Sequence, residues 1–397
     1  MSIDLRVITP ELVPALLHVD AWGFGQSPQT DDGWTRLDLD RAVGAFDGNE
    51  MVGTGRNYSL DLTLPGGAIV PTAAVSWISV LPSHRRRGIL TAVMDRLVHD
   101  ARDREEPALI LTASEGGIYA RFGFGVATHV MSVQLDRRDV AWRSSPAGRV
   151  RTLTPEAAAR VTPEVFGRVC RDQPGAVSRP EAWWESEWWD PRPGGARFDV
   201  VYEGASGAEG FALYDIRGGW TDGGPDMTLT VRDLVAATPE ASLALWQYLL
   251  GVDLITNVNL PRMPLDTELP WMLADARAMR VSSHTDFLWL RPLNVTALLG
   301  ARGYLGEGRV VLEVVDAGPA AGRFELDAGP DGAVCRATTN EADLVLGADT
   351  LGMVILGGTR PSTLVRAGRI HATDPERVRV ADALFAAERD PRALTWF

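Results

Sequence analysis

Residues 75–101, VSWISVLPSHRRRGILTAVMDRLVHDA, constrain the fold more than any other stretch of the chain. They predict a strand that ends near Leu81 and Pro82, a short loop with three arginines and Gly88, and then a helix. One face of that helix is apolar and is formed by Leu90, Val93, Met94, Leu97, Val98 and Ala101. A strand that passes directly into an amphipathic helix is typical of an α/β fold, in which the helix packs on the sheet.

The loop before this helix predicts an anion site. The first backbone N–H groups of a helix lack partners within it and carry the positive end of its dipole. Gly88 lets the backbone approach a ligand closely, and Arg85, Arg86 and Arg87 add charge-assisted hydrogen bonds. A pyrophosphate is the ligand most consistent with this loop. The alternatives are a solvated arginine loop, a surface for a protein partner, and a glycine that only starts the helix.

Composition narrows the classes of function. Every basic residue is an arginine, which excludes a P-loop lysine and a Schiff-base lysine, and the loop lacks G-x-G-x-x-G. The formal net charge of -13 argues against nucleic acid as a partner and favours cationic ligands. Cys170 and Cys335 lack metal-ligand or disulfide-framework spacing, so no metal is expected. Without a signal peptide or a membrane span, the expected location is the cytoplasm, with no membrane partner.

The chain divides into three predicted parts. Residues 1–134 and 135–291 each read as a helix, strands, a helix and a strand in similar order, which predicts two α/β domains of related fold. Residues 292–397 begin with strands of alternating polarity and end with short helices, which predicts an α+β domain.

Two motifs resemble a known family. Arg85-x-x-Gly88 after a strand resembles the pyrophosphate loop of the GNAT N-acetyltransferases, R/Q-x-x-G-x-G/A, except that Leu90 holds the last position. The combination of LPSHRRRGIL with ASEGGIYARFGFG resembles the Eis (enhanced intracellular survival) family. That family has two tandem GNAT folds, the second without a cofactor loop, followed by a domain like sterol carrier proteins. The three predicted parts agree with this order.

The resemblance implies acetyl-CoA as co-substrate, bound by the first domain. Backbone groups of Ile78, Ser79 and Val80 would meet the pantetheine and thioester, and Ser114 and Glu115 would border the cofactor. The pyrophosphate would be wrapped by Arg85, Arg86, Arg87, Gly88, Ile89, Leu90 and Thr91.

Acetyl transfer to an amine needs a base for the ammonium and an acid for the departing thiolate. By resemblance, Tyr119 is the general acid and the α-carboxylate of the terminal Phe397 is the general base. An unperturbed terminal carboxyl has a pKa of about 3.3 to 3.7, so burial must raise it or a water must relay the proton. The residues alone also offer Glu115, His84, and Asp31 or Asp32 as bases.

The acceptor amine is less constrained. Members of the family acetylate aminoglycosides and, in some cases, lysine side chains, so an aminoglycoside-type polyamine is expected. Trp34, Trp77 and Trp396 are candidate walls of the acceptor site, and Trp396 in the penultimate position also favours a more hydrophobic amine. A lipid-binding protein with an inactive GNAT domain is the alternative of a different class. The family assembles as hexamers, which implies a homo-hexamer here.

Overall fold

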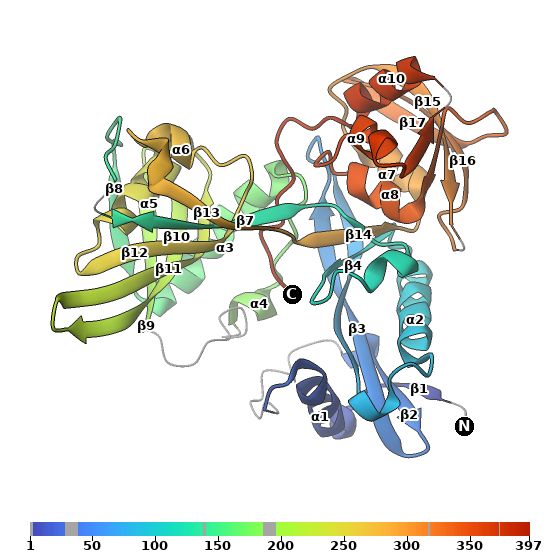
Figure 1. The fold of residues 1–397 in the computed structure, drawn as a ribbon, viewed down its shortest axis with the longest axis horizontal. Helices are drawn as coiled ribbons and strands as arrows, with labels where there is room; N and C mark the ends of the chain where they lie inside the picture. Colours follow the sequence, from blue (N-terminus) through green and yellow to red (C-terminus); the bar gives the residue numbers. More distant parts are fainter. Residues whose placement is uncertain (1–2, 28–38, 138–139, 186–195, 317, 373) are drawn as a thin grey trace. The chain divides into compact units, whose positions relative to one another are not determined.

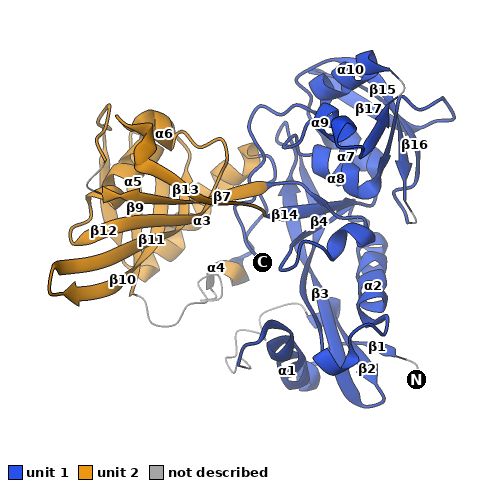
Figure 2. Ribbon diagram, viewed as in Figure 1, with its two compact units in different colours: residues 1–128, 174–182, 287–397 blue, residues 129–173, 183–286 orange. Residues whose placement is uncertain are grey.

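The computed structural model describes residues 3–27, 39–137, 140–185, 196–316, 318–372 and 374–397. Its contacts divide the chain into two compact units (Figure 2). Unit 1 comprises residues 1–128, 174–182 and 287–397, and unit 2 comprises residues 129–173 and 183–286. The chain therefore leaves unit 1 and returns to it twice. Among the described residues, no helix is long and apolar enough to cross a bilayer.

Unit 1 contains a seven-stranded sheet of order β1-β2-β3-β4-β5-β14-β6. Its strands are β1 (Asp4–Val7), β2 (Ala42–Asp47), β3 (Glu50–Thr63), β4 (Ile69–Val80), β5 (Ala108–Thr112), β6 (Gly125–Val126) and β14 (Leu288–Pro292). Helices α1 (Val13–Phe24) and α2 (Ile89–Asp103) pack on opposite sides of β3 (Figure 1). The predicted strand, loop and helix thus form β4, the arginine loop and α2.

The apolar face of α2 is buried against the sheet. Val93, Met94, Leu97 and Ala101 are fully enclosed, as the periodicity predicts. The first turn differs from the prediction, because Ile89 is buried and Leu90 is only half-buried. Both residues line a cavity, which is described below, and Ile89 also packs against Gly53 of β3.

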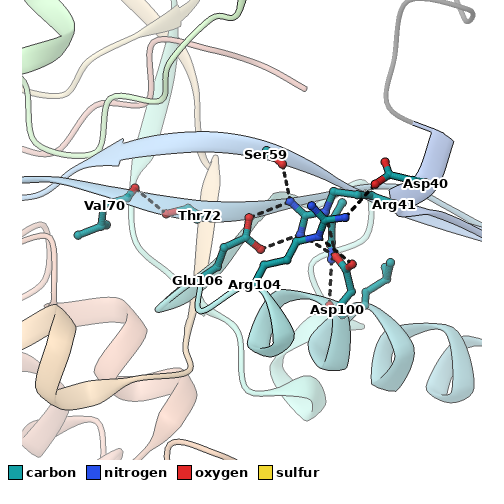
Figure 3. Close-up of polar contacts among 10 residues, drawn as sticks. Asp40, Arg41, Ser59, Val70, Thr72, Asp100, Arg104 and Glu106 are labelled. Atoms are coloured by element: carbon teal, nitrogen blue, oxygen red, sulfur yellow. Dashed lines mark hydrogen bonds and ion pairs between the residues drawn. The ribbon is translucent and has the colours of Figure 1, made fainter.

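The C-terminal half of α2 is fixed to the sheet by a buried ionic network (Figure 3). The Arg41 guanidinium donates to Asp100 Oδ2 on α2 at 2.7 Å and to Glu106 Oε2 at 2.7 Å. The same guanidinium donates to Ser59 Oγ of β3 at 2.7 Å, and the Arg41 side chain is fully enclosed. Burial opposes the charge of Asp100, but hydrogen bonds from Asn57 and Arg41 outweigh it and lower the pKa of that carboxyl.

Unit 2 contains a second seven-stranded sheet, of order β13-β7-β12-β11-β10-β9-β8. Its strands are β7 (His129–Asp136), β8 (Arg149–Leu153), β9 (Ala196–Gly204), β10 (Gly207–Thr221), β11 (Gly224–Ala236), β12 (Ile255–Met263) and β13 (Met279–Asp286). Helices α3 (Pro155–Asp172) and α5 (Pro239–Gly251) pack on this sheet, and α4 (Glu181–Glu185) and α6 (Leu269–Met272) are short. As β4, α2 and β5 do in unit 1, β11, α5 and β12 form a parallel crossover.

Each sheet receives one strand from the other part of the sequence. β7 follows β6 in the chain but pairs with β12 and β13 in the second sheet. β14 follows β13 but pairs with β5 and β6 in the first sheet. The predicted boundary between residues 134 and 135 falls inside β7, and that between residues 291 and 292 falls inside β14.

The remaining part of unit 1 is a five-stranded sheet, of order β17-β16-β15-β18-β19, with four helices. The elements are α7 (Val295–Ala301), β15 (Gly308–Val315), β16 (Gly322–Gly329), β17 (Gly332–Ala337), β18 (Leu344–Gly347), α8 (Ala348–Val354), α9 (Pro361–Arg366), β19 (Ile370–Ala372) and α10 (Pro375–Phe385). The buried Arg302 donates to the carbonyls of Leu384, Phe385 and Ala386, which end α10. α8 packs directly on β14 and β6, so this domain and the first sheet share a core.

Candidate active site

Strands β4 and β5 separate toward their C-terminal ends. The described residues show parallel pairing between them only at Ala73 with Leu109 and at Ala74 with Ile110. A bulge at Trp77, which has φ 56°, bends β4, and Thr54 Oγ1 fixes it by donating to the Trp77 carbonyl at 2.8 Å. The final residues of β4 therefore face an open wedge in the sheet.

The arginine loop and α2 close one side of this wedge. Pro82–His84 form a 3-10 turn, and Arg86 and Gly88 both take positive φ, at 62° and 81°. Gly88 is the N-cap, no side chain caps this end, and the first amide bonded within the helix is that of Ala92, to Gly88 O at 3.0 Å. The amides of the first turn are therefore free to bind an anion.

The three arginines of the loop differ in their surroundings. Arg85 and Arg86 are exposed, line the wedge, and form no ion pair with the described residues. Arg87 instead donates to Asp47 Oδ2 at 2.9 Å and lies outside the wedge lining. Two guanidinium groups and the open end of α2 thus present positive charge to the same space, which suits a pyrophosphate.

The wedge is a cavity of about 610 Å³. It brings together all the predicted cofactor residues except Arg87. These are Ile78, Ser79, Val80, Arg85, Arg86, Gly88, Ile89, Leu90, Thr91, Ser114 and Glu115. That they bind acetyl-CoA stays a prediction.

Sequence reasoning missed part of the lining. The cavity is also bordered by Gly23, Phe24, Ile118 and Arg121, and by His84, which the sequence offered only as a candidate base. Gly23 is needed where α1 crosses β4, because a Cβ there would lie 1.8 Å from Ser79 Oγ. Ser79 Oγ in turn donates to Val19 O of α1 at 2.9 Å. The glycine in DAWGFG was the available signal that α1 approaches another backbone closely.

Tyr119 also lines the cavity. It begins a 3-10 turn, Tyr119–Phe122, which ends at Gly123 with φ 78°. Its ring is buried and meets Phe124 edge-on, with ring centroids 6.2 Å apart. Burial, with a smaller contribution from the charge of Glu115, raises the pKa of Tyr119 to about 12. Tyr119 is therefore protonated at neutral pH and able to donate a proton.

The end of the chain is docked rather than frayed. Phe397 is 4% exposed, and its terminal oxygen accepts a hydrogen bond of 3.2 Å from Thr112 Oγ1. Thr112 is the last residue of β5, and the loop that follows it carries Ser114, Glu115 and Tyr119. The terminal carboxyl thus lies at the C-terminal end of the strand that leads to Tyr119. Sequence analysis singled out Phe397 but not Thr112.

The three predicted tryptophans have separate fates. Trp77 is buried at the bulge with the Arg56 guanidinium 5.4 Å from its ring centre, and it does not line the cavity. Trp396 is 40% exposed and also lies outside the lining. Trp34, like the alternative bases Asp31 and Asp32, lies outside the described residues. The roles of the three tryptophans in acceptor binding, and of Asp31 or Asp32 as base, stay predictions.

Fold and cavity together define the class of protein. The profile of the acetyltransferase (GNAT) domain matches residues 4–127, a second GNAT profile matches residues 175–292, and that of the sterol carrier protein domain matches residues 295–392. The protein is therefore a GNAT N-acetyltransferase with two GNAT domains and a sterol-carrier-type domain, a class that implies acetyl-CoA as donor.

Relatives identify the family within that class. The chain is 38% identical to an N-acetyltransferase of Streptomyces avermitilis, over 98% of this chain and 97% of the relative. It is 36% identical to the N-acetyltransferase Eis of Mycobacterium tuberculosis, over 98% of both chains. The crystal structure of Eis1 from Mycobacterium abscessus superposes with a TM-score of 0.88 at 34% identity, covering 99% of this chain and 100% of that one. The chain belongs to the Eis family of N-acetyltransferases, as the two sequence motifs predicted.

Proposed function

We propose that this enzyme transfers the acetyl group of acetyl-CoA to an amine, with Tyr119 as general acid and the Phe397 α-carboxylate as general base. The observation that supports this assignment is the hydrogen bond from Thr112 Oγ1 to Phe397 O, at the end of the strand that leads to Tyr119. The carboxylate takes a proton from the acceptor ammonium, and the amine nitrogen then bonds to the acetyl carbon. As the carbon–sulfur bond breaks, the coenzyme A thiolate takes the Tyr119 proton, and the nitrogen, now part of the amide, gives its second proton back to Tyr119.

The cavity supplies the proposed donor site. The first-turn amides of α2 with Arg85 and Arg86 bind the pyrophosphate, and the backbone of Ile78–Val80 on the separated strand bonds the pantetheine. Arg87 contributes only if it leaves Asp47. The fit is chemical as well as spatial, because anionic oxygens meet a helix N-terminus and two arginines that have no counter-ion in the part of the chain that the structure describes.

Removal of either catalytic group tests the mechanism. We expect Tyr119→Phe and deletion of Phe397 each to lower kcat by about 100-fold or more, since general acid–base groups contribute factors of about 10² to 10⁴. Coenzyme A affinity should change less than about threefold, because neither change touches the arginine loop. Steady-state kinetics and calorimetric titration with coenzyme A measure the two quantities. A C-terminal extension that leaves kcat unchanged would exclude the carboxylate as base.

The pH profile gives a second check on Tyr119. With its pKa raised to about 12, Tyr119 keeps its proton across the neutral range, so kcat should show no decline due to Tyr119 between pH 7 and pH 9. A descending limb in that range that disappears in Tyr119→Phe would contradict the assignment.

The proposed acceptor is an aminoglycoside-type polyamine. The net charge of -13 supports attraction of polycations. A lysine-containing peptide or a hydrophobic amine is the alternative, and the exposed face of Trp396 in the penultimate position favours the latter. Thiol release from acetyl-CoA with one amine of each class decides between them. A homo-hexamer in the cytoplasm, without nucleic acid or membrane partners, completes the proposal, and light scattering measures the assembly.

A further inference from the structure

The last residues of the chain lie against a segment from the middle of the sequence, residues 174–179, which we call the anchor segment. The anchor segment itself belongs to the first sheet, since Val177 forms an antiparallel bridge with Leu62 of β3. Thr63 N donates to Ala176 O at 2.9 Å, Gly175 N donates to Thr63 O at 2.8 Å, and Ser178 N donates to Asp61 O at 2.9 Å. A strand of the first sheet therefore holds the anchor segment in a fixed register.

The C-terminal tail, residues 391–397, is bonded to the anchor segment at successive points. Arg392 N donates to Pro174 O at 2.8 Å, and Thr395 Oγ1 donates to Val177 O at 2.7 Å. Thr395 is fully buried, as is Val177. The anchor segment, which is paired with β3, therefore fixes the position of the tail along that strand.

Arg179 adds a two-point contact close to the chain end. Its Nη2 donates to Leu394 O at 2.5 Å, and its Nε donates to Thr395 Oγ1 at 3.3 Å. Thr395 Oγ1 is therefore shared, because it accepts from Arg179 and donates to Val177 O. Trp396 is the one residue between Thr395 and Phe397, whose terminal oxygen accepts the hydrogen bond from Thr112.

We infer that Arg179 and Thr395 are positioning residues that hold the terminal carboxylate at the reacting amine. This inference rests on the proposed function, in which that carboxylate is the base. Chain ends ordinarily fray, and each extended residue spans about 3.3 to 3.6 Å, so loss of the contact two residues upstream frees the carboxylate to move by several ångströms. Misplacement of a reacting group by about 1 Å can cost about 100-fold in rate.

Three variants and a matched control test the inference. Arg179→Met removes both guanidinium contacts, Arg179→Lys keeps the charge but not the two-point contact, and Thr395→Val keeps the shape but removes the shared hydroxyl. Arg389→Met is the control, since Arg389 is exposed in the chain just before the tail and loses the same charge. Thermal unfolding confirms that each variant is folded. If Arg179→Met does not fold, Thr395→Val carries the test alone.

Two measurements are made on the full-length variants. The rate at which carboxypeptidase Y releases Phe397 reports how firmly the tail is held and needs no acceptor. The split between kcat and KM for acetyl-CoA is measured with the amine that reacts fastest in the panel above. We expect Phe397 release to accelerate at least tenfold and kcat to fall about 10- to 100-fold in Arg179→Met and Thr395→Val. KM for acetyl-CoA should stay within about twofold, and Arg179→Lys should fall between wild type and Arg179→Met.

The outcomes separate this inference from the proposed function. Unchanged Phe397 release in both Arg179→Met and Thr395→Val overturns the anchoring role. Faster release with unchanged kcat overturns the positioning role, even if deletion of Phe397 abolishes activity and so supports the carboxylate as base. If deletion of Phe397 leaves kcat unchanged, the proposed function fails first. A fall in kcat in the Arg389→Met control would also overturn the inference.

Discussion

Helices α2 and α5 occupy the same place in two similar sheets but are secured at opposite ends. α2 is held near its C-terminus by the Arg41 network, and its N-terminus has no side-chain cap. α5 is capped at its N-terminus, where Thr238 Oγ1 accepts from Ala241 N at 3.2 Å. Thr238 Oγ1 also donates to Glu209 Oε2 at 3.2 Å, which places a carboxylate where an anion would otherwise bind. A crossover of this kind is therefore not enough for the proposed phosphate site, which also needs the uncapped helix end and the arginines of the first domain.

The strand pairs beside these two helices also differ, in how far they stay paired. β11 and β12 remain paired over four residue pairs, from Met227 with Ile255 to Thr230 with Asn259. β4 and β5 pair at two positions only and then separate. The first domain thus gives up backbone hydrogen bonds at the place where a ligand can supply them. The second domain keeps these bonds within its own sheet.

The largest effect is expected at the C-terminal end of α2, which the Arg41 network holds. Arg41→Met leaves Asp100 and Glu106 without their shared buried partner, and breaking such a network costs about 3 to 5 kcal/mol in the free energy of unfolding. The control is Arg309→Met, because the Arg309 pair with Asp327 is exposed to solvent and contributes little to stability. Urea unfolding measures both. Equal losses in the two variants would show that the network does not anchor α2.

A smaller effect is expected at the uncapped N-terminal end of α2. The double variant Arg85→Gln, Arg86→Gln should raise the Kd of coenzyme A about 10- to 100-fold, because each glutamine replaces a charge-assisted hydrogen bond with a neutral one that is weaker by about 1 kcal/mol. Calorimetric titration at two salt concentrations checks the change and its electrostatic origin. Arg87→Gln is the matched comparison. If Arg87→Gln weakens binding as much, Arg87 exchanges Asp47 for the cofactor.

The smallest effect is expected at the cap of α5. Thr238→Ala should lower the stability of unit 2 by about 1 kcal/mol, the usual value of an N-cap threonine. Coenzyme A should bind this variant and the wild type with the same Kd and one molecule per chain. Calorimetry reports the stoichiometry. A second coenzyme A bound per chain, in either protein, would break the contrast between the two helices.

Local patterns explain which features the sequence could reveal. The period of α2 and the glycine that starts it depend on residues close in the chain, so the helix, its buried face and the loop were predictable. The two family motifs extended this to three domains and pointed to the chain end. The exceptions within the motif region are Leu90, which is only half-buried, and Arg87, which bonds to Asp47. Both depend on contacts from outside the segment.

Contacts between residues far apart in the chain could not be predicted from the sequence in this way. Nothing in the residues around Arg179 or Thr395 indicates that they meet, because 216 positions separate them in the chain. The same holds for Thr112 and Phe397, and for the exchange of β7 and β14 between the sheets. The bulge that buries Trp77 away from the cavity lining could not be predicted either, since a positive φ at one residue cannot be read from strand periodicity.

Because β14 is translated long after β5 and β6, the first sheet stays incomplete for part of the synthesis of the chain. When residue 128 has emerged from the ribosome, β5 and β6 are complete, but β14, which belongs between them, is still to be translated. At about 5 to 20 residues per second, roughly 10 to 30 s pass before it arrives. During that interval the edge of β5 that later pairs with β14 is open, and other chains can occupy it. A ribosome that stalls within unit 2 therefore leaves a fragment with an open sheet, a ready substrate for chaperones.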